Sequence, residues 1–456
     1  MFWRLRGKAI RAAKRRPTKG ITMERFALLS SLVRVTSALA LGACLVAWAL
    51  PAQAQLTGTR NVPGDYATLE AALTDLNTVG VGAGGVTINL LAANPQTAPA
   101  GGYTINLAAS NATAANPITL VGNGNTITAP TTHVVGALND AIFKIIGEDH
   151  VTIENFVMQE NAANTTTVAA SNNMTEWGIA LIYRSVTDGA QNVTLRGNTI
   201  TLNRTYQNTF RIYANATHTL AAPTTSATAT DPAGGNSGLV VRGNTISNVN
   251  IGVVVVGPTA AANHNAVVTI GGDLVADGNS ITNYGTTGTF SSYANVSGTV
   301  NGILLRNTQA FSIRNNTLTS SDGGTTAGTL RGIFVVGGST APTGTHQQSI
   351  RNNSISVRSG VATGALAGII VESSASTPTS TVTINDNTLR NSGYTLASGT
   401  SSGAVTGISL GGSATLGPLA TAINGNRPEP YAEHQRQRDA DLEQFHSPSQ
   451  RHDHRQ

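Results

Sequence analysis

Acidic residues that could act in pairs are scarce in this chain. Hydrolysis of a glycosidic bond uses two facing carboxyl groups, yet residues 55–426 contain only 16 Asp and Glu. The densest group is Glu148-Asp149-His150, and Glu154 follows it closely. These acids lie in or just after a turn between two short apolar segments. We therefore name Glu148, Asp149 and Glu154 as candidate catalytic residues. We nevertheless expect these three acids to belong to a solvated turn and not to a catalytic site.

Two further acids, Asp273 and Asp277, could contribute to a calcium site, because carboxylate oxygens suit that ion. The segment around them lacks the alternating oxygen ligands of an EF-hand loop. We therefore expect no metal or other cofactor, with calcium as the alternative. Trp177 is the only tryptophan beyond the N-terminal region. It could stack on a sugar ring, but we expect it in the core.

Glycine-rich and serine motifs stand in the wrong context for catalysis. Gly80–Gly85 matches GxGxxG, but the expected helix precedes it and a strand follows, the reverse of a dinucleotide site. Residues 399–403 and 407–411 match GxSxG. A nucleophile elbow needs a strand-to-helix turn, whereas Ser409 lies inside a repeated strand. None of these motifs predicts a site.

One motif recurs along most of the chain: alternating apolar residues, then Asn, any residue and a final apolar residue. Clear copies are 193–200, 239–246, 311–318 and 382–389, and looser copies end at Asn125, Asn279, Asn353 and Asn426. From Asn198 onward the asparagines recur at intervals of 34 to 46 residues. A segment of Gly followed by a β-branched residue alternates with this motif, as in Gly302-Ile303.

This pattern predicts short strands that are buried on one face and must stack on neighbouring copies. Asn tolerates left-handed backbone geometry at a tight turn, and stacked Asn side chains can form a hydrogen-bonded ladder. We predict this ladder for Asn198, Asn244, Asn279, Asn316, Asn353 and Asn387. The Thr/Ala/Gly/Ser-rich stretches 214–237, 257–266 and 284–299 are expected to be loops on one flank. A leucine-rich repeat, whose copies are shorter, is the competing prediction.

The repeats resemble the right-handed parallel β-helix proteins of the pectin-lyase-like superfamily over residues 58–426. The resemblance implies an all-β solenoid, and Val62–Leu73 looks like its N-terminal cap, with a short amphipathic helix near residues 67–77. The repeats are also similar to those of secreted surface proteins of Bacteroidota. Lyases of the superfamily pair acidic calcium ligands with Arg or Lys, and its hydrolases carry clustered Asp motifs. Neither pattern is visible in this sequence.

The first 54 residues have the pattern of an export signal. Arg25 and Arg34 precede the apolar run 38–50, and residues 52–54, Ala-Gln-Ala, form a small-x-small cleavage pattern. We expect translation from Met23, cleavage after Ala54, and a secreted or cell-surface protein with no transmembrane helix in the mature chain. Attachment of a lipid to Cys44 is the alternative.

The repeat domain is expected to span residues 55–426, and residues 427–456 break its pattern. This tail is polar and rich in charge and His, so we expect it to be disordered or the product of a shifted reading frame. Beyond residue 54 the chain has 18 basic and 22 acidic residues. Without a basic stripe that carries aromatic residues, we expect no nucleic-acid partner.

Two functions remain open at this point. The first is a non-catalytic surface solenoid that is structural, adhesive or glycan-binding, with polysaccharides or cell-surface components as partners. The alternative is a polysaccharide lyase or glycoside hydrolase whose site is assembled across coils. An aligned row of acidic and basic side chains would favour the enzyme, and bare Thr/Asn/Ser faces would favour the binding protein. The scarcity of acids favours the binding protein.

Overall fold

A computed structural model describes most of the repeat region. The described residues are 54–108, 112–131, 133–168, 172–285, 292–296, 299–320, 329–337, 346–361, 363–372, 381–395, 401–411 and 420–429. The expected start at Met23, the alternative lipid site Cys44 and the tail beyond Glu429 lie outside them. Among the described residues, no helix is long and apolar enough to cross a membrane.

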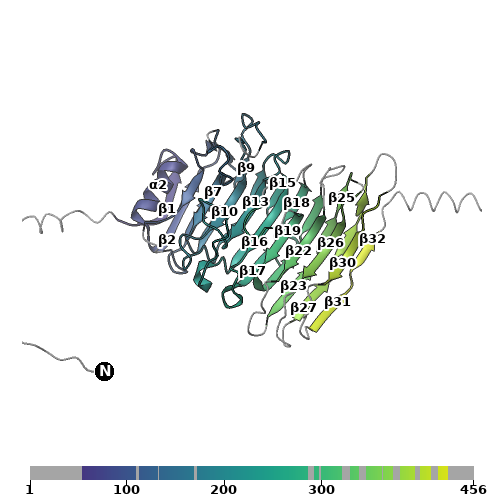
Figure 1. Ribbon diagram of the computed structural model, residues 1–456. Helices are drawn as coiled ribbons and strands as arrows, with labels where there is room; N and C mark the ends of the chain where they lie inside the picture. The colour runs from purple at the N-terminus through teal and green to yellow at the C-terminus, as the bar shows by residue number, and fades with distance from the viewer. Residues whose placement is uncertain are drawn as a thin grey trace, which may run out of the picture. The chain divides into compact units, whose positions relative to one another are not determined.

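Three long sheets, in which neighbouring strands are parallel, make up the fold (Figure 1). Sheet A contains β1 (Leu56–Val62), β2 (Val81–Leu90), β5 (Ile118–Val121), β8 (Val151–Glu154), β11 (Thr194–Arg196), β14 (Leu239–Arg242), β17 (Asn265–Gly271), β20 (Thr308–Arg314), β23 (Gln347–Arg351), β27 (Thr381–Asn385) and β31 (Ala420–Asn424). Sheet B contains β3 (Gln96–Thr97), β6 (Thr126–Thr128), β9 (Val157–Gln159), β12 (Thr199–Thr201), β15 (Thr245–Val249), β18 (Ser280–Tyr284), β21 (Thr317–Ser320), β24 (Ser354–Ser356), β28 (Thr388–Arg390) and β32 (Arg427–Glu429). Sheet C contains β4 (Tyr103–Ile105), β7 (Ala141–Ile146), β10 (Trp177–Ile182), β13 (Phe210–Asn215), β16 (Ile251–Val256), β19 (Val300–Arg306), β22 (Leu330–Val336), β26 (Leu366–Glu372) and β30 (Val405–Leu410).

The chain visits sheets A, B and C in turn, so each circuit forms one coil that stacks on the previous one. This arrangement confirms the predicted parallel β-helix, right-handed as parallel crossovers almost always are. A small extra pair, β25 (Arg358–Ser359) and β29 (Gly393–Tyr394), lies in two later coils. The last coil extends three residues beyond the predicted boundary at Asn426, because β32 continues the pairing register of β28.

The predicted N-terminal helix is α2 (Leu69–Val79), two residues later than expected. The Thr68 hydroxyl caps its first turn by accepting a hydrogen bond from the backbone N–H of Ala71 at 3.2 Å. Leu69, Leu73 and Leu76 are buried on one face, as their spacing predicts.

An asparagine column runs along the turn between sheets A and B. We define it as Asn198, Asn244, Asn279, Asn316, Asn353, Asn387 and Asn426. The backbone N–H and side-chain Nδ2 of each of the first six donate to Oδ1 of the next member, at 2.8–3.2 Å. Asn316 is fully buried. These hydrogen bonds join coils that stack on one another.

At six of the seven column positions the left-handed residue of this turn is the residue before the column asparagine, and not the asparagine itself as the sequence predicted; Gly278, with φ −64°, is the exception. Gly197 has φ 64°, Asn315 φ 57° and Asp386 φ 57°. Glycine, Asn and Asp tolerate this region. The sharp turn at this residue lets the following asparagine point into the stack.

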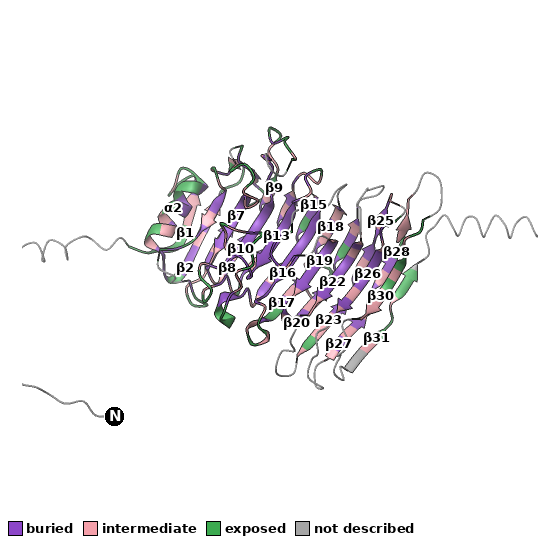
Figure 2. Ribbon diagram, in the orientation of Figure 1, coloured by how far each residue is buried: buried purple, intermediate pink, exposed green. Residues whose placement is uncertain are grey.

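The solenoid interior holds the main apolar core, and Figure 2 shows buried residues along the strands of sheet C. Two of the expected loops, 214–237 and 257–266, contribute to connections from sheet C to sheet A. The described part of 284–299 instead connects sheet B to sheet C. The prediction of loops on one flank was therefore wrong, because strand order and not composition decides which corner carries an insertion.

Candidate functional site

The outer face of sheet A carries an aligned row of charged side chains. An arginine lies two residues before four of the column asparagines, at the end of a sheet A strand: Arg196, Arg242, Arg314 and Arg351. Arg196 pairs with Arg242 and Arg314 pairs with Arg351 on neighbouring strands, and Gly271 takes this position on the strand between the two pairs. Glu154 lies beside Arg196, and Asn385 lies beside Arg351. Neighbouring strands lie about 4.8 Å apart. We call Arg196, Arg242, Arg314 and Arg351 the arginine row.

Three members of the arginine row contact a carboxylate. Arg196 pairs with Glu154 of the previous coil, and Arg314 pairs with Asp273. Arg242 Nη1 lies 3.5 Å from Asp277 Oδ1. Their side chains remain 31–45% exposed, so water and ligands can reach them. The fourth member, Arg351, has no ion-pair partner among the described residues. The arginine row therefore has one more cation than it has paired carboxylates.

A row of hydroxyl side chains runs beside the arginine row, two residues earlier on each strand. It contains Thr152, Thr194, Thr269, Ser312, Ser349 and Thr383, and Val240 interrupts it. Hydroxyl groups can donate and accept hydrogen bonds. The face therefore offers repeated cationic and neutral polar groups along one line.

The metal candidates Asp273 and Asp277 face arginines rather than each other. The described residues contain no group of three or more side chains that could hold a metal ion. An arginine beside each carboxylate opposes the approach of a cation. The arrangement is that of surface ion pairs.

The catalytic candidates do not converge on one point. Glu148 is fully buried, pairs with Arg184, and accepts a hydrogen bond from the Leu107 backbone N–H at 2.9 Å. Asp149 accepts one from the Gln191 N–H at 2.7 Å, and Glu154 belongs to the charged row. Burial raises the pKa of Glu148 to about 7. The expectation of a solvated turn was wrong for Glu148, because neighbouring coils cover it.

Trp177 is buried, but not in the solenoid interior. It lies on the outer face of sheet C in a second apolar cluster, stacked on Tyr213 with ring centroids 4.7 Å apart. Phe210 and Tyr293 complete this aromatic group. A sugar cannot stack on an enclosed ring, so Trp177 acts in packing, as expected.

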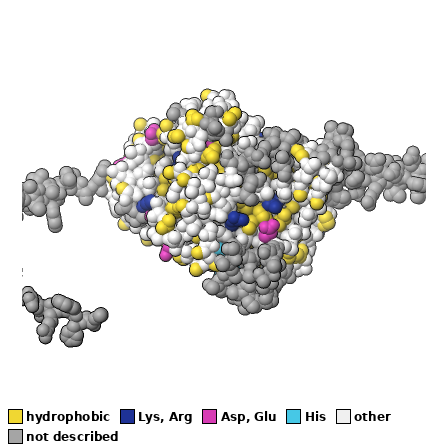
Figure 3. Space-filling model, in the orientation of Figure 1, with side chains coloured by type: hydrophobic (Ala, Val, Ile, Leu, Met, Phe, Trp, Pro, Cys, Tyr) yellow, Lys and Arg dark blue, Asp and Glu magenta, His cyan; other side chains and the backbone are white. Residues whose placement is uncertain are grey.

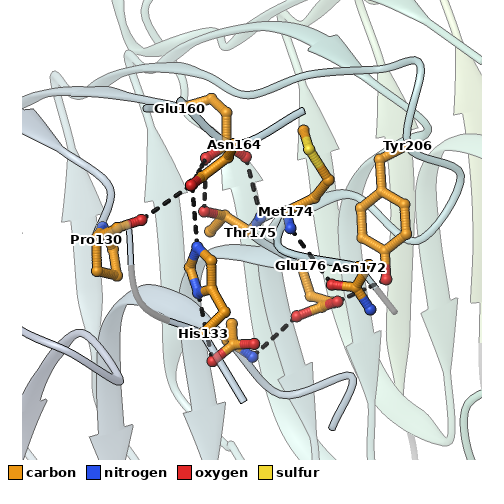
Figure 4. Close-up of polar contacts among 10 residues, drawn as sticks. Pro130, His133, Glu160, Asn164, Asn172, Met174, Thr175, Glu176 and Tyr206 are labelled. Atoms are coloured by element: carbon orange, nitrogen blue, oxygen red, sulfur yellow. Dashed lines mark hydrogen bonds and ion pairs between the residues drawn. The ribbon is translucent and has the colours of Figure 1, made fainter. Parts of the chain in front are cut away.

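A buried polar cluster at the edge of sheet C was missed by sequence reasoning (Figure 4). Glu176 accepts hydrogen bonds from the Tyr206 hydroxyl at 2.6 Å and from the Asp140 N–H at 2.9 Å. His133 Nδ1 lies 3.5 Å from Asp140 Oδ1. Burial raises the pKa of Glu176 to about 8. These residues come from three coils, so no linear motif joins them.

Asn164 connects this cluster to Glu160, as Figure 4 shows. Its Nδ2 lies 2.7 Å from Glu160 Oε1 and 3.0 Å from His133 Nε2. The Thr175 hydroxyl and N–H also donate to Glu160. A surface hollow of about 500 Å³ lies over Glu160, Asn164 and Asn203. Glu160 is already saturated with donors, which fits a structural role.

Further groups capable of proton transfer lie on the same face of sheet C. The Tyr213 hydroxyl is 2.8 Å from His218 Nε2, and both side chains are fully buried. Burial lowers the pKa of His218 to about 4, so the imidazole is neutral at pH 7. Burial also lowers the pKa of Lys144, and the charges of Asp140 and Glu176 oppose that shift. These groups could move protons only if the covering loops opened.

The later strands of sheet C present charged and apolar side chains together. The Arg331 guanidinium lies 3.8 Å from the centroid of the Phe334 ring. Burial lowers the pKa of Arg306 and Arg331, and the charge of Glu372 partly offsets this. Figure 3 shows basic, acidic and hydrophobic side chains side by side over β19, β22 and β26.

Comparisons with known proteins give the chain no family. No family model and no curated protein matches it. One solved structure that is similar is the Azotobacter vinelandii mannuronan C-5 epimerase AlgE6 A-module, with 12% sequence identity and a TM-score of 0.26. The match covers 76% of this chain and 91% of that one.

Proposed function

We propose that this chain is an exported, non-catalytic surface solenoid that binds acidic glycans through the outer face of sheet A. The observation that carries the proposal is the arginine row, in which Arg196 lies beside Arg242 and Arg314 beside Arg351, with one coil that carries Gly271 between the two pairs. A guanidinium recognises carboxylate or sulfate groups with two parallel hydrogen bonds. A linear polymer with anionic groups could contact several members at once.

The proposed binding is weak at each position and becomes useful through repetition. Three of the four arginines already pair with carboxylates, of which Asp273 is exposed, Asp277 is half-buried and Glu154 is buried. An incoming anion must compete with these partners. Exposed ion pairs are worth about 0–1 kcal/mol, so the competition is modest at Arg242 and Arg314. Several simultaneous contacts raise the overall affinity without any new type of contact.

The charged row alone does not separate the two functions left open by the sequence. Sheet A carries an aligned row of both signs, while other positions carry bare Thr and Ser. What supports binding is the state of the carboxylates: Glu154, Asp273 and Asp277 each face an arginine. None is free to act as a general acid or base in the present arrangement.

A polysaccharide lyase or glycoside hydrolase is the second candidate. The Tyr213–His218 contact, with Lys144 and Glu176 on the same face, favours it. A neutral imidazole can accept a proton in an elimination reaction. Such a site would need the side chains packed on Tyr213, among them Tyr293, to move, since both Tyr213 and His218 are fully buried.

The deciding experiment measures binding and cleavage together. The purified protein is titrated with polygalacturonate, alginate and duplex DNA, with and without calcium, at two salt concentrations. We expect salt-sensitive glycan binding without products, and at least tenfold weaker binding by the double variant Arg242→Ala/Arg314→Ala. Arg390→Ala, an exposed arginine outside the row, is the matched control.

Three outcomes would contradict the proposal. Unchanged affinity of the double variant would remove the arginine row from the site. Tighter binding to DNA than to either glycan would change the partner class. Unsaturated or reducing products that vanish in Tyr213→Phe or His218→Gln would establish the enzyme.

A further inference from the structure

The outer face of sheet B carries a regular array of hydroxyl groups. On β12, β15, β18, β21 and β24, both outward positions are Thr or Ser. We define the hydroxyl array as Thr199, Thr201, Thr245, Ser247, Ser280, Thr282, Thr317, Thr319, Ser354 and Ser356. Pairing places the first residue of each strand beside the first of the next, and the second beside the second.

The array has two fixed repeats. Neighbouring coils separate equivalent residues by about 4.8 Å, and the two residues of one strand lie about 6.7 Å apart. The buried residue between them, such as Ile200 or Leu318, anchors the strand in the core. The positions of the hydroxyl groups are therefore set by the backbone lattice.

The asparagine column fixes the spacing of the first row. Each first-row residue directly follows a column asparagine, as in Asn198-Thr199 and Asn316-Thr317. Its backbone N–H donates to the carbonyl of the preceding column member at 2.8–2.9 Å in the next four coils. If one coil moved relative to the next, these backbone bonds and the hydrogen bonds of the asparagine column would both break. The array is therefore held rigidly.

Part of the array is available to a ligand, and none of its members is charged. Ser356 is buried and donates to the Asn391 carbonyl, and Ser354 accepts a hydrogen bond from Arg390. Six hydroxyl groups have no hydrogen-bond partner among the described residues: Thr199, Thr245, Ser280, Thr282, Thr317 and Thr319. Thr201 and Ser247 contact each other at 3.1 Å. The array also contains no aromatic ring, the group that usually stacks on sugars. The charged row lies on sheet A instead.

We propose that the hydroxyl array binds the surface of an ice crystal. Hexagonal ice presents rows of oxygen atoms whose repeat along one axis is close to the spacing between coils. Hydroxyl oxygens at those positions can take the place of lattice water, and the threonine methyl groups favour ordered water beside them. An uncharged, rigid array suits an uncharged crystalline partner. A flexible anionic glycan would be attracted to the charged row on sheet A instead.

This function is independent of the proposed glycan binding, because the two use different sheets. The test places the purified full-length protein in freezing solutions and measures ice-crystal shape and the lowest concentration that blocks recrystallisation. In Thr245→Tyr/Thr317→Tyr, two bulky rings disrupt the array at exposed positions. Thr119→Tyr, at an outward position of sheet A away from the arginine row, is the matched control.

We expect faceted ice crystals with the unmodified protein and with Thr119→Tyr. The double variant should need at least a tenfold higher concentration while keeping the same melting temperature. Arg242→Ala/Arg314→Ala should retain full ice activity, which separates this function from glycan binding. Unmodified ice growth, or equal activity of the double variant, overturns the proposal. Binding to crystalline cellulose or chitin that depends on the array, without an effect on ice, assigns the array to a glycan lattice and also overturns it.

Discussion

Replacement of Asn316 by Leu tests whether the asparagine column stabilises the coil stack. Asn316 is fully buried and has a column member on each side. Its Oδ1 accepts hydrogen bonds from the backbone N–H and Nδ2 of Asn279, and its Nδ2 donates to Asn353 Oδ1 and to the Ile270 carbonyl. Leucine removes all four of these bonds.

The expected loss in the free energy of unfolding depends on which polar groups are left without a hydrogen-bond partner. The backbone N–H of Asn279 loses its acceptor inside a closed turn, which costs about 1–3 kcal/mol. The other three bonds contribute about 0.5–1.5 kcal/mol each, and the buried leucine methyl groups offset part of the loss. We expect the free energy of unfolding to fall by about 3 kcal/mol, measured by urea denaturation.

Asn426→Leu is the matched control at the end of the same column. Asn426 is only half-buried and has one column neighbour, Asn387. Water can replace its lost bonds, so we expect a decrease of about 1 kcal/mol. Equal losses for the two variants would refute the argument, because position within the column would then have no effect. In the coil before Asn198, Phe156 takes the place of a column asparagine. Its backbone N–H donates to Asn198 Oδ1, and its ring packs against Phe143.

Three further predictions concern stability. The pKa of Glu176 in the folded protein, about 8, lies above the ordinary glutamate value, so between these two values the folded protein holds a proton that the unfolded chain releases. The melting temperature should therefore fall as pH rises from 5 through 8. Glu176→Gln should remove this part of the dependence of melting temperature on pH. Gly332→Ala places a Cβ 2.5 Å from Ile355 Cγ2 and should cost about 1–3 kcal/mol, whereas Gly407→Ala, at the same repeat position with nothing within 4 Å, should cost less than 1 kcal/mol in the same denaturation assay. Truncation after Glu429 should leave the melting temperature and solubility unchanged, because the removed tail has no apolar period; loss of the folded core would show that the tail is a cap.

The sequence by itself determined the fold and the turn that repeats in it. Alternating apolar residues define strands with one buried face, and the recurrence of the asparagine motif every 34 to 46 residues predicts that those strands stack. Both signals are local, so they survive without any knowledge of tertiary contacts. The capping helix was equally visible, since Leu69, Leu73 and Leu76 follow a helical period.

The arginine row was present in the sequence as an arginine two residues before four of the asparagines. Its meaning depended on the register between coils, because arginines 37 or 46 positions apart become neighbours about 4.8 Å apart only when the strands pair. The same register turns isolated Thr and Ser residues into the hydroxyl array. A search for motifs within one segment cannot detect either arrangement.

Only the tertiary structure decided which polar groups are buried. The sequence pattern predicts that Glu148 lies in a solvated turn, yet Arg184 and Leu107 of neighbouring coils enclose it. Glu176, Tyr206 and Asp140 meet because the connections from sheet B to sheet C of three successive coils lie beside one another. Burial, and with it the pKa of each group, is a property of contacts between coils. The sequence therefore specifies the path of the chain, while the packing of one coil on the next decides the chemistry that its side chains can perform.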